Sequence, residues 1–181
     1  MDLDPRKFPR SLYMFRRYDS IFRGLFSSEK RVLERALGSK VAIEHVGSTA
    51  VEGLGGKRIL DIIIGSKGPR LSDLKRMLER IGYIYVKKSG RPPRRLFFYR
   101  YRAYKGKRLR IHVHLCTYDG RDWKERIVFR DYLRRNKDKV LEYEAVKKRA
   151  VKLAKGSKRV YVMEKDLFVK KTLKKAVNEG F

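Results

Sequence analysis

The chain has 181 residues, of which 42% are hydrophobic, with 48 Lys and Arg against 20 Asp and Glu. This length and apolar content predict a single folded domain over residues 1–181 and exclude a disordered chain. The one cysteine, Cys116, excludes an internal disulfide and favours a reducing compartment. No signal-peptide core and no run of transmembrane length is found, so we expect a cytoplasmic protein without a membrane partner.

The positive charge is too large to be absorbed by surface ion pairs, because 20 acids leave 28 bases without a one-to-one partner. Residues 80–118 contain twelve Lys or Arg and no acid, and seven Tyr or Phe stand among them. Bases neutralise phosphates and exposed rings stack on unpaired bases of nucleic acid. The segment therefore predicts a surface for RNA or another polyanion, although the same alternation also describes an ordinary strand with one face in the core.

The expected elements change type along the chain. Apolar positions at a helical period predict helices, and apolar runs or alternation predict strands. In chain order we expect helices 10–26 and 27–38 (with Ser27-Ser28 as its cap), strands 41–46 and 59–65, helix 71–81, strands 83–87, 95–104 and 108–116, and helices 122–135, 138–155 and 164–178. This order predicts an α+β fold, a mixed sheet flanked by helices with a helical C-terminal third.

The strand 59–65 carries one carboxylate, Asp61, among Ile and Leu residues. Such a group costs free energy unless a cation, a proton or several hydrogen bonds compensate it. Upstream, Gly47, Ser48 and Thr49 form a turn whose backbone N–H groups and hydroxyls suit phosphate oxygens. Together they predict a phosphorylated ligand and a divalent metal side by side, with Mg²⁺ or Mn²⁺ on Asp61. A buried acid paired with Arg or Lys is the alternative.

Two of the three histidines, His112 and His114, alternate on one face of the strand 108–116. Two His spaced by two on a strand can bind a metal ion or hydrogen-bond phosphates; otherwise they are half-exposed sheet residues. Glu44 and His45 point to opposite faces of the strand 41–46, so at most one of them faces the same site. Either Glu44 faces the site, as an additional catalytic or metal-binding carboxylate, or His45 does. The sequence alone does not choose between them.

Several of these stretches match a known family. The Gly-Ser turn followed, after twelve residues, by an acidic strand resembles the nucleotidyltransferase superfamily. More narrowly, IEHVGSTAV (43–51), LDI (60–62), HVHL (112–115) and FRDYLR (129–134) resemble the GrpB family over a core of about 28–170. The resemblance implies that the His112 strand lies beside the Asp61 strand. It also implies nucleotide contacts from Arg130, Lys147 and Lys165. One departure is Ile63, which stands where active nucleotidyltransferases carry a second acid.

We therefore expect a metal-dependent nucleotidyltransferase that uses a nucleoside triphosphate and an acceptor such as RNA. The missing acid at Ile63 motivates an alternative, a nucleic-acid-binding protein that uses the fold without chemistry. A third alternative, a role in coenzyme A metabolism, rests on GrpB-like domains that are fused to dephospho-CoA kinase in some bacteria. The series Arg126, Arg130 and Arg134 recurs every four residues, which is most often a solvated helix face.

Overall fold

The structure is a computed structural model that describes residues 15–155 and 157–181. Its five strands are β1 (Val41–Val46), β2 (Ile59–Ser66), β3 (Ile84–Tyr85), β4 (Arg95–Tyr104) and β5 (Lys107–Thr117). They form one sheet in the order β1-β2-β5-β4-β3. β2 and β5 are parallel and the other neighbours are antiparallel, so the predicted mixed sheet is confirmed.

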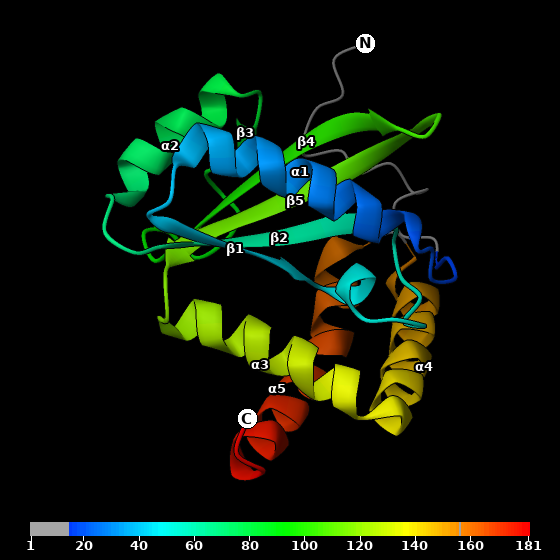
Figure 1. Cartoon of the computed structure of the whole chain (residues 1–181). Coiled ribbons are helices and arrows are strands. Elements are labelled where there is room, and N and C mark those ends of the chain that lie inside the picture. The colour runs from blue at the N-terminus through cyan, green and yellow to red at the C-terminus, as the bar shows by residue number, and fades with distance from the viewer. Residues whose placement is uncertain (1–14, 156) are drawn as a thin grey trace.

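Helices cover both faces of the sheet (Figure 1). One face carries α1 (Ile21–Leu37) and α2 (Leu71–Arg80), and the other carries α3 (Arg121–Arg135), α4 (Lys137–Ala154) and α5 (Lys158–Asn178). A short 3-10 turn, η2 (Ser48–Ala50), follows β1. The α+β class and the helical C-terminal third are as predicted. No helix of the described residues is long and apolar enough to cross a bilayer.

The main hydrophobic core lies between the sheet and the α1–α2 layer. Alternate residues of each strand point there, because side chains on a strand change face at every residue. Ile62 of β2 and Val113 of β5 are adjacent in register and fully buried, and Leu25 and Leu33 of α1 pack in the same cluster. The opposite strand positions, which include Asp61, face α3–α5 and leave that side of the sheet more polar.

The predicted N-terminal helices are wrong. Residues 10–14 lie outside the described residues, and the two helices expected on either side of Ser27 are one helix, α1, with Ser20 at its N-cap position. The two serines do not cap because their hydroxyls have other partners: Ser27 Oγ donates to the carbonyl of Arg23, one turn back, and Ser28 Oγ accepts from Arg102. A serine pair within an amphipathic helix therefore imitated a helix start.

Two further boundaries differ from prediction. α5 begins at Lys158 rather than 164, since Ser157 accepts a hydrogen bond from the N–H of Val160 and the buried Tyr161 packs on α4. The predicted strand 83–87 shortens to the two residues of β3. Tertiary contacts that local periodicity does not report decide both ends.

Candidate functional site

The sheet register brings the predicted acid and the two predicted histidines together. Asp61 of β2 lies opposite His112 of the parallel strand β5, and Ile63 lies opposite His114. Asp61 Oδ1 is 3.2 Å from His112 Nδ1 and 3.8 Å from His114 Nε2. The neighbouring-strand relation implied by the family resemblance is therefore present, and all three side chains face α3–α5.

The other carboxylate oxygen of Asp61 meets the Gly-Ser turn. A Cβ atom added to Gly47 would lie 2.6 Å from Asp61 Oδ2, and the backbone at Gly47 has a φ of 74°. Both the left-handed conformation and the close approach require glycine. The turn and the acid, twelve residues apart in sequence, are thus in direct contact.

The protonation states in this group follow from burial and from the hydrogen bond. Burial by itself would raise the pKa of Asp61, but its interactions with the ring of His112, which is its hydrogen-bond partner, and with the ring of His114 outweigh burial and hold the pKa well below its ordinary value. Burial lowers the pKa of His112, and that of His114 to about 3, so both rings are neutral near pH 7. His112 therefore donates through Nδ1–H to Asp61, and its Nε2 is left as a buried acceptor.

That Nε2 of His112 has no hydrogen-bond partner within the part of the chain that the structure describes, and neither has Nδ1 of His114. Buried polar atoms are almost always paired, and an exception points to an absent ligand, ion or water. The carboxylate on one side of the His112 ring and the unpaired nitrogen on the other resemble the arrangement of an orienting acid and a general base.

Cationic side chains from three helices converge on the same place. Lys147 Nζ of α4 is buried and donates to the carbonyl of Gly55. A Cβ atom on Gly56 would lie 2.5 Å from Ser48 Oγ and 3.5 Å from Lys147 Nζ, so the hydroxyl and the ammonium both border this glycine. Arg126 of α3 and Lys165 of α5 are near enough to interact electrostatically with Asp61.

We call this group the Asp61 cluster; it comprises Asp61, Gly47, Ser48, His112, His114, Arg126, Lys147 and Lys165. Burial, together with the charge of Lys165, lowers the pKa of Lys147 to about 7. Burial likewise lowers the pKa of Lys165, and that of Arg126 to about 10. Asp61 is the one carboxylate within the cluster, and it faces three partly desolvated cations, on which Glu144, Asp166 and Asp122 act from outside the cluster. Such an imbalance favours the binding of an anion.

The choice between Glu44 and His45 is decided by the strand. Glu44 lies on the face of Asp61, whereas His45 points to the α1 side, where it stacks on Phe26. Thr49 Oγ1 donates its hydrogen bond to the carbonyl of Ile59. It can therefore only accept from His45, whose Nε2–H is the donor. Burial lowers the pKa of His45 to about 4, and it is neutral at pH 7. The Thr49 hydroxyl is committed to these bonds, although we had expected it to bind phosphate.

Glu44 and Arg130 are joined to each other rather than to Asp61. Arg130 Nη1 lies 2.6 Å from Glu44 and donates to the carbonyl of His45, while its other nitrogens bond Asp131. These bonds tie α3 to the end of β1. Arg130 is 8% exposed, so it departs from the solvated face that is usual for such an arginine series, whereas Arg134 of the same series is exposed. The catalytic role of Glu44 and the nucleotide role of Arg130 remain predictions.

The expected metal fits this arrangement in a restricted way. Among the described residues, no group of three or more His, Cys, Asp and Glu is placed to hold a metal ion. Mg²⁺ in nucleotide sites is held by one or two carboxylates together with phosphate oxygens and water. Asp61 Oδ2 fits an ion that arrives with a nucleotide. The full ligand set of Asp61, Glu44, His112 and His114 does not form a preformed centre, since Arg130 holds Glu44.

Sequence reasoning missed two members of the environment. Arg126 belongs to the noted arginine series, and its position four residues before Arg130 placed it on the inward face, but no rule told that this face was buried. Gly56 was assigned to a connector. The close approach of Ser48 and Lys147 explains why glycine stands there.

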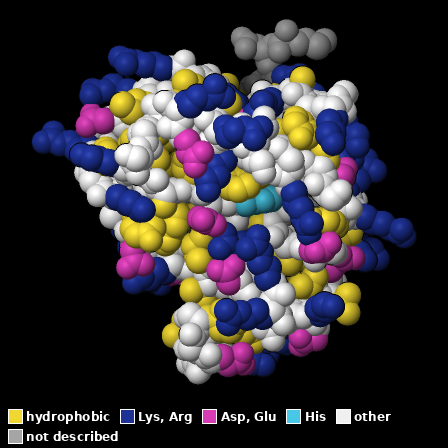
Figure 2. Space-filling model, in the orientation of Figure 1, with side chains coloured by type: hydrophobic (Ala, Val, Ile, Leu, Met, Phe, Trp, Pro, Cys, Tyr) yellow, Lys and Arg dark blue, Asp and Glu magenta, His cyan; other side chains and the backbone are white. Residues whose placement is uncertain are grey.

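The predicted polyanion surface of residues 80–118 is less uniform than its sequence. Several of its bases already have acidic partners: Arg95 with Asp122, Arg100 and Arg102 with Glu29, and Lys107 with Asp19. Four of its aromatic residues are buried, namely Tyr83, Phe97, Phe98 and Tyr99. On the face that Figure 2 shows, Lys and Arg side chains are spread widely, with acidic and apolar groups between them.

Comparison with known proteins gives a consistent relationship. The family described as "GrpB protein" matches residues 14–175. The Glutamate-rich protein GrpB of Alkalihalophilus pseudofirmus is 31% identical over 154 residues, which cover 82% of this chain and 87% of that protein. The UPF0157 protein YqkA of Bacillus subtilis is 27% identical, and the match covers 84% of this chain but 44% of that protein.

A solved structure agrees with the sequence matches. The crystal structure of the conserved protein GrpB from Enterococcus faecalis superposes with a TM-score of 0.76 at 29% identity, covering 92% of this chain and 98% of that one. The matched segment contains the Gly-Ser turn, Asp61 and the two histidines. The chain belongs to the GrpB family.

Proposed function

We propose that the Asp61 cluster binds a nucleoside triphosphate and that the protein transfers its nucleotidyl group to a hydroxyl acceptor. The observation that carries this proposal is the contact of Asp61 Oδ2 with Gly47, beside a serine hydroxyl and the buried ammonium of Lys147. A phosphate-binding turn, a carboxylate and desolvated cations are the parts that phosphoryl chemistry uses, since its catalysis is mostly positioning and charge stabilisation.

In this proposal the phosphates lie over the Gly47-Ser48 turn. Lys147 and Lys165 neutralise the terminal phosphates, and their lowered pKa values rise again when the anion binds. Arg126 offsets charge on the side of α3. Mg²⁺ held by Asp61 and the phosphate oxygens would supply charge neutralisation during the reaction.

The reaction is an in-line displacement. The acceptor oxygen forms a bond to the α-phosphorus, the bond from that phosphorus to the bridging oxygen breaks, and pyrophosphate leaves with the electron pair. The proton of the acceptor hydroxyl passes to His112 Nε2, the unpaired nitrogen on the ring that Asp61 orients. His112 thereby has a role that does not require it to bind a metal.

The test is label transfer from each α-labelled nucleoside triphosphate, with Mg²⁺ or Mn²⁺ and total cellular RNA as the acceptor pool. Asp61→Asn keeps the shape of the side chain and should reduce transfer by roughly 1,000-fold or more. Lys147→Met should weaken nucleotide binding by about tenfold, the loss of one charge-assisted hydrogen bond. The matched control is Lys171→Met, an exposed lysine of α5. Equal transfer by wild type and Asp61→Asn would contradict the proposal.

One observation favours a second candidate, nucleic-acid binding without chemistry. Ile63, at the position of the second acid, is fully buried with Val46, Cys116 and Trp123. A carboxylate there would be desolvated without a partner, so this chain is built around an apolar side chain at that position. This candidate predicts that RNA affinity falls as salt rises. For each tenfold rise in salt concentration, the logarithm of the affinity should fall by about 0.7 for every phosphate contact. It also predicts that Asp61→Asn retains that affinity.

A further inference from the structure

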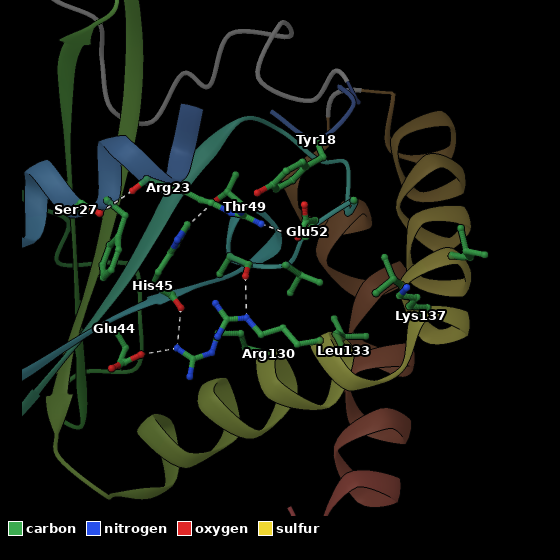
Figure 3. Close-up of a pocket in the computed structure, with 17 residues that line it drawn as sticks. Tyr18, Arg23, Ser27, Glu44, His45, Thr49, Glu52, Arg130, Leu133 and Lys137 are labelled. Atoms are coloured by element: carbon green, nitrogen blue, oxygen red, sulfur yellow. Dashed lines mark hydrogen bonds and ion pairs between the residues drawn. The ribbon is translucent and has the colours of Figure 1, made fainter. Parts of the chain in front are cut away.

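A second concave region lies on the other side of η2, beside the Asp61 cluster. It is a groove of about 950 Å³ between the start of α1, the η2 turn and the junction of α3 with α4 (Figure 3). This volume is within the range of small-molecule sites. His45 lines the groove, and both Asp61 and Arg134 act on its pKa. Residues of two motifs line it, among them His45 of 43–51 and Arg134 of 129–134, but the proposed nucleotide site does not use this groove.

The groove has an apolar floor. Val51, Leu133 and Val140 line it and are buried, and they belong to the small core beneath η2. Leu141 lines it too and is 72% exposed. A ligand with an aliphatic or aromatic body would bury Leu141.

The charges of the groove are unbalanced. Four cationic side chains line it, Arg23, Arg130, Arg134 and Lys137, against two acids, Glu44 and Glu52. The acids are already paired, because Arg23 lies 2.6 Å from Glu52 and Arg130 lies 2.6 Å from Glu44. The remaining cations, Arg134 and Lys137, have no acid of the groove lining as a partner.

The surroundings of Arg134 point the same way. Its Nε donates to the carbonyl of Ala50, which fixes the guanidinium against η2. Its Nη1 is 3.5 Å from Asp131, but Arg130 already holds both oxygens of that carboxylate. Burial and then the neighbouring charge of Arg130 lower the pKa of Arg134. Lys137, the first residue of α4, forms no ion pair within residues 15–155 and 157–181. An anion bound at Arg134 would offset the charge that it shares with Arg130.

We propose that this groove is a ligand site, distinct from the Asp61 cluster, for a small amphipathic anion with one carboxylate or phosphate and an apolar body. The anionic group lies between Arg134 and Lys137, and the apolar body lies on Val51, Leu133 and Leu141. The neutral His45 contributes no charge, so the two cations carry the selectivity. The site does not depend on nucleotidyl transfer.

The experiment is a titration of the ¹⁵N-labelled full chain, followed by the shifts of backbone amides. Octanoate and octyl phosphate are the anionic probes, which separate carboxylate from phosphate recognition, and octanol is the neutral probe. We expect saturable shifts at residues 49–53 and 133–141 with at least one anion, and at least tenfold weaker binding of octanol. Uniform shifts, or octanol binding as tightly as both anions, would overturn the proposal.

Variants locate the effect. The double change Arg134→Gln with Lys137→Gln should weaken the anion by at least tenfold. The control Lys171→Gln with Lys174→Gln removes the same charge from exposed positions of α5 and should leave the affinity within twofold. Leu141→Asp, at an exposed position that needs no repacking, should also weaken the anion by at least fivefold. Equal losses in the α5 control would show that net charge alone is responsible, and unchanged binding in both groove variants would place the ligand elsewhere; either result would overturn the proposal.

Discussion

Two carboxylates, Glu29 and Asp61, lie on opposite sides of the sheet, and their surroundings differ. Glu29 of α1 is 0% exposed and accepts bonds from Tyr83, Arg100 and Arg102. Asp61 is half-buried, accepts one hydrogen bond from His112, and faces cations that do not touch it. The first carboxylate is saturated by its own chain. The second retains an oxygen that faces the Gly-Ser turn.

The difference separates a structural charge from one that is available for chemistry. A fully hydrogen-bonded buried ion pair fixes the fold and has no capacity left for a ligand. An acid that is surrounded by unpaired nitrogens and repelling cations stores binding capacity instead. The sheet thus has one face, under α1 and α2, on which the buried acid is fully paired, and another, under α3, α4 and α5, on which Asp61 is not.

The most direct test of this comparison is to measure the stability of two variants, Glu29→Gln and Asp61→Asn. We expect Glu29→Gln to lower the free energy of unfolding by about 3 to 5 kcal/mol, because Arg100 and Arg102 lose their shared partner in a buried place. Asp61→Asn should cost about 1.5 kcal/mol, the scale of one hydrogen bond to a charged group. Denaturant unfolding at pH 7 measures both. A larger loss for Asp61→Asn would reverse the assignment of structural and functional roles.

A second test compares two glycines with the same backbone conformation. Gly47 has φ 74° and Gly53 has φ 76°, but only at Gly47 would a Cβ meet another group, Asp61. Gly53→Ala should cost about 1 kcal/mol for its positive φ. Gly47→Ala should cost about 1 to 3 kcal/mol more because of the overlap with the carboxylate. Thermal unfolding gives the difference, and equal losses would mean that the turn does not press on Asp61.

Much of this arrangement was predictable from local signals. The alternation in β5 placed His112 and His114 on one face, and the Ile-rich context of β2 made Asp61 conspicuous. Gly47-Ser48 predicted a tight turn, because glycine readily adopts the positive φ that tight turns need. The family resemblance supplied the remaining step, that β2 and β5 are neighbours.

The rest depends on contacts across the chain. Whether Glu44 or His45 faces Asp61 is set by the register of β1 on β2, and a shift of one residue would exchange them. The partners of Glu29 come from residues 54 to 73 positions away. The groove beside η2 is formed by segments from α1, η2 and α4 that share no pattern. Periodicity reports none of these.

The net charge also proved separable from the site. A relative is named for its glutamate content, whereas this chain has 48 Lys and Arg against 20 Asp and Glu. The cations of the Asp61 cluster are inward-facing residues of α3, α4 and α5, and they differ in placement from the exposed lysines of the surface. The function that we propose for the cluster therefore depends on a few desolvated groups, and the bulk charge is a distinct property of this chain.

The smallest expected effect is a pH dependence that belongs to Lys147. Its pKa of about 7 lies below its ordinary value of 10.5, because burial and Lys165 disfavour the charge. The folded state binds fewer protons than the unfolded state between these values, so this group adds stability as the pH rises from 7 toward 10.5. A bound phosphate favours the ammonium. Nucleotide affinity should accordingly be full below pH 7 and fall above it by up to about tenfold in total, the loss expected for Lys147→Met.

Isothermal titration of a nucleoside triphosphate between pH 6 and pH 9 measures this dependence, with proton uptake read from buffers of different ionisation enthalpy. Lys147→Arg keeps the charge at every pH in this range and should remove the decline, whereas Lys147→Met should bind weakly and without the decline. Titration of the nucleotide itself is common to all three proteins and cancels in the comparison. If the decline persists in Lys147→Arg, another group causes it. Asp61 and the Gly-Ser turn would then remain as the ligand-binding features of the proposed site.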